Sequence, residues 1–217
     1  MSKSKKGEKR ERILDVAEEL FALHGYDGVT MRQVSTGAQV DVALANYHFG
    51  KKLDLFYAVF NRRADYLAST RKELLLANRD NAGDKPQTLE QIIEVFLLPL
   101  KLAQESGDPG WKNYMALLAY VMNSATWNNI LMKDNFDRFV GEFINALKLT
   151  FPKATDEDIH WCYHYVSGAL ALTLAQTGRI DRLSGGKCLS SDFDAAYDRM
   201  IPFMAAGFRA ICGDESD

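Results

Sequence analysis

The sequence predicts an all-α protein with two domains joined by a long helix. Apolar residues recur at helical spacing along most of the 217 residues, and the alternation typical of a β-strand does not occur over any length. Two short helices with a tight turn between them are predicted within residues 30–52. We therefore expect a small helix-turn-helix domain at residues 1–54 and a larger helical domain at residues 55–217.

The composition is that of an ordinary globular protein, with 47% hydrophobic residues, 25% charged residues and a net charge of −3. Any contact with nucleic acid must therefore come from a local patch. The three cysteines are too few and too scattered for a disulfide framework, so we expect a reducing compartment. Because there is no apolar signal-peptide core and no run of about 18 apolar residues, we expect a cytoplasmic protein without a membrane span. A basic patch is visible at the N-terminus: Lys3, Lys5, Lys6, Lys9, Arg10 and Arg12.

The first helix is expected from about Glu8 to His24, after a flexible arm at residues 1–7, and Gly25 suits a left-handed C-cap. Thr30 can cap the next helix, with Gln33 three residues later as in a capping box, and this helix should end near residues 37–38. Asp41 can cap a helix from about residue 42 to 48. This last helix is too short to be stable alone, so its neighbours must hold it and its outer face is available to a ligand.

A long helix is predicted from about residue 53 to 78, and it can act as a lever between the two domains. A loop is expected at residues 78–84. The next helix begins after Thr88, is kinked at Pro99 and is broken at residues 106–110. Helical patterns follow over residues 111–129 and 134–151. Two long helices at about 156–177 and 191–212 end the chain, with a loop at 179–190 between them and a bend at Pro202.

The segment from about residue 8 to 57 resembles the DNA-binding domain of the TetR family of bacterial transcriptional regulators. The resemblance rests on ILDVAEELFALHGYDGVTMRQV at residues 13–34, on the small Ala38 in the turn, on NYHFGKK at residues 46–52 and on the following Leu55-Phe56. The chain departs from the family pattern at Gln39, where a turn glycine is usual, and at the Asp41 cap. An apolar run at residues 42–45 also replaces small polar residues. The turn should still form, but contacts with bases should be sparse and apolar.

Contacts with phosphate fix a protein's position on DNA, whereas contacts with base edges carry sequence information. For phosphate we expect Thr30, Arg32, Tyr47, His48 and Lys52, because a helix start, a guanidinium, an ammonium and polar ring atoms suit an anion. For base edges we expect Gln33 and Asn46, with Ala43 and Leu44 on thymine methyl groups. The alternative is that Tyr47 and His48 are ordinary packed or surface residues, as we expect Phe49 to be in the core.

Bulky apolar residues are dense between about residues 86 and 150. Such helices can pack a solid core or surround an apolar cavity, and periodicity alone does not separate the two. The resemblance implies an effector pocket whose occupation changes the separation of two DNA-binding heads. Because few charges lie inside this stretch, we expect an apolar or aromatic effector, or one with a long acyl chain. The C-terminal half also weakly resembles the family's fatty-acid-responsive repressors. The candidate ligand contacts are Phe96, Leu100, Trp111, Tyr114, Met115, Leu118, Met122, Trp127, Phe139 and Phe143.

The last two long helices are rich in small and apolar residues, which let helices approach closely. In the family, this pair packs against its two-fold mate, so the resemblance implies a homodimer; the alternative is packing within one chain. Such a dimer places two recognition helices about 34 to 36 Å apart, or somewhat more, and predicts a near-palindromic operator on double-stranded DNA. Repression is the family's usual mode.

Rival functions carry less support from the sequence. His160 and His164 lie four residues apart, but a zinc site needs a third and usually a fourth ligand, so we expect no metal. The segment Gly185-Gly186-Lys187 lacks the spacer of a phosphate-binding loop, and no nucleophile arrangement is evident, so we expect no enzyme and no cofactor. The main alternative is a helical protein that binds small molecules and has a degenerate head that does not bind DNA.

Overall fold

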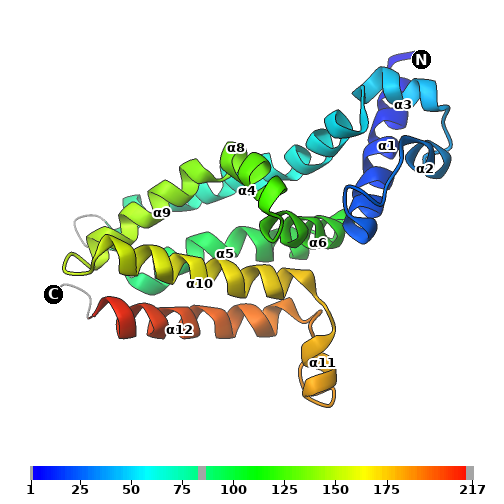
Figure 1. The fold of residues 1–217 in the computed structure, drawn as a ribbon. Helices are drawn as coiled ribbons and strands as arrows, with labels where there is room; N and C mark the ends of the chain where they lie inside the picture. Colours follow the sequence, from blue (N-terminus) through cyan, green and yellow to red (C-terminus); the bar gives the residue numbers. More distant parts are fainter. Residues whose placement is uncertain (1, 83–86, 214–217) are drawn as a thin grey trace.

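The computed structural model describes residues 2–82 and 87–213, and within these ranges it contains helices and no strand. The prediction of an all-α fold is therefore confirmed. Figure 1 shows a small head at one end of an elongated helical body. The head is formed by α1 (Ser2–His24), α2 (Met31–Gly37) and α3 (Val42–Phe49), and α4 (Lys52–Ala82) leads from it along the body. The predicted boundary between residues 54 and 55 falls in the first turn of α4 and stays a prediction.

Two predicted non-helical stretches are helical. The arm predicted at residues 1–7 is wrong over residues 2–7, because α1 begins at Ser2. The loop predicted from residue 78 is wrong as far as Ala82, where α4 ends, and residues 83 and 84 lie outside the described ranges. In both stretches each residue other than Gly7 disfavours a helix by only about 0 to 0.7 kcal/mol relative to alanine. Extending an existing helix is therefore inexpensive.

The body contains α5 (Leu89–Glu105), α6 (Gly110–Met122), α9 (Asp137–Thr150), α10 (Asp156–Ala175) and α12 (Phe193–Cys212). Pro99 and Pro202 both lie inside helices, as expected. Between α6 and α9 the chain forms α7 (Ala125–Trp127), the π-helical segment η1 (Asn128–Met132) and α8 (Lys133–Asn135). This irregular stretch faces the head end of the body (Figure 1).

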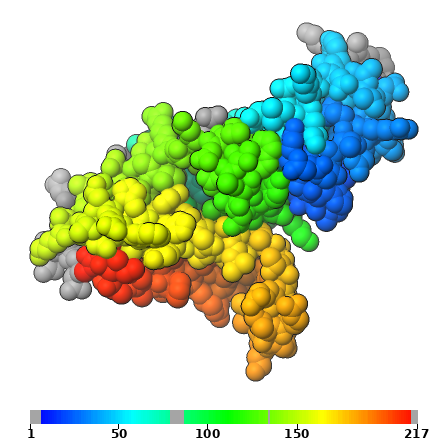
Figure 2. All heavy atoms as spheres, viewed as in Figure 1, coloured from blue at the N-terminus to red at the C-terminus, as the bar shows by residue number. Residues whose placement is uncertain are grey.

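The loop predicted at residues 179–190 contains a further helix, α11 (Arg179–Leu183), so that prediction is wrong at its start. Gly178 has a φ of 68°, which only glycine adopts without strain, and this lets the chain reverse from α10 into α11. Arg179, Arg182 and Leu183 favour a helix, and Ile180 and Asp181 disfavour one by less than about 0.7 kcal/mol each. Figures 1 and 2 show α11 and the turn after it projecting from the body as a separate lobe beside α10 and α12.

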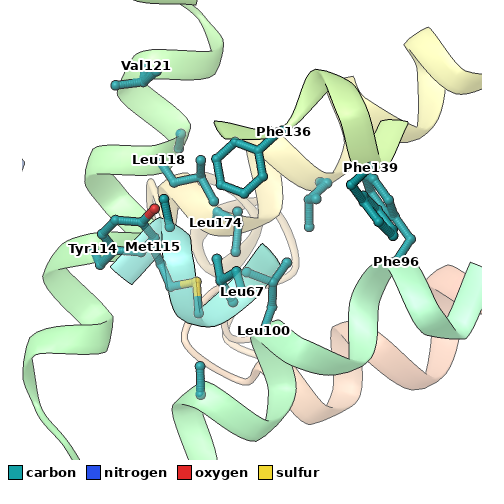
Figure 3. Packing of buried hydrophobic residues seen from close by; sticks show 14 of the residues in the cluster. Leu67, Phe96, Leu100, Tyr114, Met115, Leu118, Val121, Phe136, Phe139 and Leu174 are labelled. Atoms are coloured by element: carbon teal, nitrogen blue, oxygen red, sulfur yellow. The ribbon is translucent and has the colours of Figure 1, made fainter. Parts of the chain in front are cut away.

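One continuous hydrophobic core links the head and the body. Figure 3 shows part of it, where Leu67 of α4, Leu100 of α5 and Met115 of α6 turn toward one another. The head is packed directly on the body, because α1 lies against α6. A Cβ atom at Gly25 would approach the Tyr120 ring to 3.1 Å, so the end of α1 fits closely on α6.

Candidate functional site

The turn between α2 and α3 forms without the usual glycine. Gln39 adopts a left-handed φ of 52°, which is uncommon for a residue with a Cβ atom. Backbone bonds close the turn on both sides, with Val40 N donating to the Ser35 carbonyl at 3.0 Å. The Arg12 side chain of α1 donates from Nε to the Ala38 carbonyl at 2.6 Å. The departure at Gln39 is therefore accommodated by the backbone, and α1 holds the turn from behind.

The capping box predicted at the start of α2 is confirmed. Gln33 N donates to Thr30 Oγ1 at 3.2 Å, and Thr30 N donates to Gln33 Oε1 at 2.8 Å. The Gln33 carbonyl oxygen is thus engaged, and only its amide nitrogen is left for a base edge. Asp41 stands at the N-cap of α3, as predicted, but its side chain makes no capping hydrogen bond. Its extended backbone, with ψ at 147°, already starts the helix.

The nine candidate DNA contacts lie on α2, on α3 and at the start of α4. Thr30, Arg32 and Gln33 are exposed and, with Leu20 and Thr36, line a shallow hollow. On α3, Ala43, Asn46 and Tyr47 are exposed, and 70% of the Tyr47 side chain is accessible. Leu44 and His48 are half-buried, and the His48 ring packs edge-on against Tyr47 at 5.5 Å between centroids. The buried Ala45 and Phe49 anchor the other side of α3.

Lys52 is held more firmly than the sequence indicates. Its Nζ donates to the Tyr26 carbonyl at 3.0 Å and lies 4.1 Å from the centre of the Tyr26 ring. The Lys52 side chain is half-buried, so its charge is fixed in place beside the end of α3. An ammonium has three N–H donors, and one of them is used here. The others are free to meet a phosphate without loss of the Tyr26 contact.

A charged cluster joins the head to the body, and we call it the Glu18 clamp: Glu18, Arg62, Arg63 and Asp108. Glu18 of α1 is 1% exposed, and its Oε2 accepts from Arg62 Nη2 at 2.6 Å and from Arg63 Nε at 2.8 Å. Arg63 also donates to Asp108, just before α6, at 2.7 Å. The Arg63 guanidinium lowers the pKa of the Asp108 carboxyl. Sequence reasoning missed this cluster, although Glu18 falls among the apolar positions of the first helix.

The ten candidate effector contacts do not form one group. Phe96, Phe139 and Phe143 stack together, with the Phe96 ring 5.0 Å from Phe143 and 6.0 Å from Phe139. Leu100, Tyr114, Met115 and Leu118 lie in the neighbouring part of the core (Figure 3). Trp111 packs on Tyr66 and under the Arg63 guanidinium. Met122 is half-buried at the end of α6.

Trp127 lies apart from the other nine residues, at the junction with the head. Its ring is 4.7 Å from Tyr26 and 4.8 Å from Phe56.

A second residue that sequence reasoning missed is Arg71 of α4, which is 4% exposed inside the body. The interruption of the α4 apolar pattern by a charge on its buried side was the available signal.

The outer face of α10 and α12 carries several exposed apolar side chains. Trp161 is 50% exposed, Leu172 64% and Phe203 74%. Between them lies an apolar hollow, lined by Cys162, Tyr165, Val166, Ala169, Phe203, Met204, Ala206, Gly207, Phe208 and Ile211. A group of exposed apolar side chains around an apolar hollow is typical of a protein interface.

The histidine pair on α10 is used in other contacts. His160 Nδ1 lies 2.6 Å from the Asp156 carbonyl, and His164 packs edge-on against Trp161. Across the described ranges, no cluster of three histidine, cysteine or acidic side chains is arranged to hold a metal ion. A search of the same residues finds no helix with the length and apolar character needed to cross a membrane.

The fold and the head define a helix-turn-helix protein with an attached helical body. Residues 13–59 match the model described as bacterial regulatory proteins, tetR family. Residues 94–207, just over half of the chain, match the tetracyclin repressor-like C-terminal domain. The chain belongs to the TetR family of bacterial transcriptional regulators.

The similar proteins agree with this assignment. The HTH-type transcriptional activator FasR of Mycolicibacterium smegmatis is 33% identical over 89 residues, which are 41% of this chain and 39% of FasR. A TetR-like regulator from Rhodococcus sp. RHA1 has a TM-score of 0.61 at 15% identity, over 95% of this chain and 97% of that one. The fatty acid degradation regulator FadR from Bacillus halodurans has a TM-score of 0.61 at 14% identity, over 93% and 96%. The matched part spans about two fifths of FasR, and the two structures show the fold alone.

Proposed function

We propose that this protein is a ligand-responsive, DNA-binding transcriptional regulator that acts in the cytoplasm as a homodimer. It is a repressor that a hydrophobic small molecule releases from a near-palindromic operator. The observation that carries the proposal is that α2 and α3 expose polar side chains on one side, while their other side is packed into the core of the head. A short helix with an outer face rich in exposed side chains is suited to the major groove.

The contacts with DNA divide into two kinds. In this proposal Thr30 and Arg32 at the start of α2, together with Tyr47, His48 and Lys52, contact phosphate oxygens; the exposure of Thr30, Arg32 and Tyr47 supports it. Ala43, Leu44 and Asn46 on α3, with the Gln33 amide nitrogen, face the bases. The apolar side chains contribute contacts with methyl groups and few hydrogen bonds, so we expect modest sequence preference.

The effector response requires a path from the body to the head. α4 runs through both parts, and the Glu18 clamp ties it to α1 and to the start of α6. Trp127 adds an aromatic contact between the η1 region and Tyr26. A ligand among the ten candidate residues, or beside them, would move α4 against these ties and change the separation of the two heads in a dimer.

A second candidate function is a helical ligand-binding protein whose head does not bind DNA. The apolar run at residues 42–45 on the recognition helix favours it, because it leaves few polar groups for bases. The unusual residue Gln39 in the turn does not favour it, because backbone hydrogen bonds close the turn between α2 and α3.

The decisive experiment is a salt titration of binding to the DNA that precedes this chain's own coding sequence. Arg32 and Lys52 in two heads neutralise four phosphates, so the plot of log K against log salt should have a slope of about −3.6 or steeper, at about −0.9 for each phosphate. A scrambled fragment of equal length is the control for sequence preference. If neither fragment binds at low salt, the proposed DNA-binding regulator is excluded and the ligand-binding protein without DNA binding is favoured.

A further inference from the structure

Arg71 is a buried cation without a counter-ion in the described part of the chain. It lies on α4, 4% exposed, and no carboxylate among the described residues forms an ion pair with it. Three aromatic faces cover its guanidinium instead, with Cζ at 5.1 Å from the centre of Phe96, 5.5 Å from Phe136 and 5.0 Å from Phe139. Removal of an unpaired charge from water is costly, and proteins seldom do so unless a partner is supplied.

The charge is present at neutral pH. Burial lowers the pKa of Arg71 to about 10, and the nearby Tyr114 and Tyr163 act in the opposite direction. A group with that pKa is almost fully protonated at pH 7. The core of the body therefore holds a positive charge that the described side chains do not neutralise.

One neutral group fixes the orientation of the guanidinium. Nε and Nη2 donate to the Phe96 carbonyl at 3.3 and 3.2 Å. Pro99 stands three residues further along α5, and its missing N–H leaves the neighbouring Val95 carbonyl without its helical donor. A guanidinium has five N–H donors, and no described residue accepts a bond from Nη1. The Phe96 carbonyl therefore orients the Arg71 guanidinium without neutralising its charge.

A second unused donor lies on α6, within electrostatic reach of Arg71. Tyr114 is fully buried, and its hydroxyl has no hydrogen-bond partner among the described residues. Burial raises the pKa of Tyr114, so the hydroxyl keeps its proton, and the Arg71 charge acts on it in the opposite direction. Figure 3 shows Tyr114 among the side chains that converge on this part of the core, with Phe136, Phe139 and Phe96 across from it.

A cation with free N–H groups and a phenol without an acceptor together form an incomplete site for an anion. We propose that Arg71 and Tyr114 bind the carboxylate head of the effector, an organic monocarboxylate whose apolar body lies against Phe96, Phe139 and their neighbours. This deepens the proposed function and rests on it. A carboxylate matches the planar fork of arginine, and it brings the single negative charge that one guanidinium can neutralise. A phosphate monoester would bring up to two charges to one cation.

The position of Arg71 also connects binding to the head. It lies nineteen residues after Lys52 on the same helix, which is roughly 28 Å at 1.5 Å per residue. Because aromatic rings now cover the guanidinium, an entering carboxylate must displace them and repack the contacts of α4 with α5 and α9. The anion would therefore act directly on the helix that carries the head.

The test uses the full-length protein and three probe acids: octanoate, dodecanoate and 4-phenylbutanoate. The primary amide of each acid is the neutral match, and dodecyl phosphate tests the other oxyanion. Binding is measured by calorimetry, and thermal unfolding is followed in parallel. At least one acid should bind about tenfold or more tightly than its amide, since only the acid brings the charge.

The variants separate this site from general packing. Arg71→Met should abolish the preference for acid over amide and leave the thermal midpoint of the free protein unchanged or higher, because an unpaired buried charge is removed. Tyr114→Phe removes one hydroxyl, should weaken the acid by about threefold to tenfold and should leave the fold intact, so it keeps the test valid if Arg71→Met does not fold. Leu102→Met on the exposed side of α5 is the control and should change nothing.

Several outcomes overturn the proposal. Equal binding of acid and amide, unchanged acid binding in both variants, preference for dodecyl phosphate, or no binding of any of the three acids would each do so. DNA binding is measured separately. If an acid binds through Arg71 but does not release DNA, the site is supported and the effector response fails. If the protein binds no DNA, the site is still decided by calorimetry.

Discussion

At the scale of single residues, Lys52 shows how one side chain serves structure and contact together. The family resemblance assigns it to phosphate, and the structure ties its ammonium to the Tyr26 carbonyl and ring. The proposed phosphate contact would use the same charge as the Tyr26 contact but a different N–H group. Loss of this side chain should therefore affect DNA binding and the stability of the head at once.

We expect Lys52→Ala to weaken binding to specific and scrambled DNA alike and to reduce the salt slope by about one for each head. The head should also lose about 1 kcal/mol of stability, because a hydrogen bond and a cation–π contact disappear. Salt-titrated binding and thermal unfolding measure the two effects. Lys187→Ala, at an exposed lysine far from the head, is the matched control. An unchanged slope in Lys52→Ala would remove Lys52 from the phosphate contacts.

Gln39 is a second residue where sequence and structure meet. The sequence lacks the usual turn glycine but is still expected to form the turn, and in the structure Gln39 itself takes the left-handed conformation. The cost for such a residue is roughly 1 to 2 kcal/mol. The bond from Arg12 to the Ala38 carbonyl and the backbone bonds of the turn compensate for it.

At the scale of elements, the Glu18 clamp joins α1, α4 and the start of α6. Its centre is a carboxylate that is 1% exposed and shared by two guanidinium groups. Its outer carboxylate, Asp108, is 50% exposed. Asp15, which pairs with Arg62 from outside the clamp, is 66% exposed. The buried centre should therefore contribute most of the stabilising effect of the cluster.

Glu18→Gln should lower the free energy of unfolding by about 3 kcal/mol, because it leaves two guanidinium groups without their shared counter-charge. Asp15→Asn removes an exposed partner of Arg62 and should cost less than about 1 kcal/mol. Urea denaturation of both variants gives the comparison. Equal effects in the two variants would show that the clamp does not depend on burial.

At the scale of the whole molecule, the exposed face of α10 and α12 decides whether two heads can act together. Phe203, Tyr165 and Leu172 are all more than half exposed, which is costly on a surface that stays in water. A two-fold partner would cover them and fill the hollow between the helices.

Phe203→Glu should convert the dimer to monomer, with dimer affinity reduced about tenfold or more, because it places a charge in the centre of an apolar contact. Leu149→Glu is the matched control, since Leu149 on α9 is 79% exposed and lies outside this face. Sedimentation velocity at micromolar concentration shows whether each variant is a monomer or a dimer. A dimer that survives Phe203→Glu, or that Leu149→Glu disrupts, would place the interface elsewhere.

The sequence by itself determined the helices, most of their caps and the family. Apolar periodicity, the Thr30–Gln33 cap and the turn at Gly25 depend on neighbours within a few residues, so they can be read along the chain. Where the sequence signal was weak, at residues 2–7, 78–82 and 179–183, the preference against a helix was small and the fold overrode it.

Only the tertiary structure decided which buried charges have partners. Glu18 finds Arg62 and Arg63 more than forty residues away, Lys52 finds the Tyr26 carbonyl, and Arg71 finds a carbonyl and three aromatic faces. The physical reason is that burial makes an unpaired charge costly, while the position of its partner depends on how distant helices pack. That is also why sequence reasoning proposed apolar residues for an effector site and missed Arg71, the buried cation that we propose binds the effector.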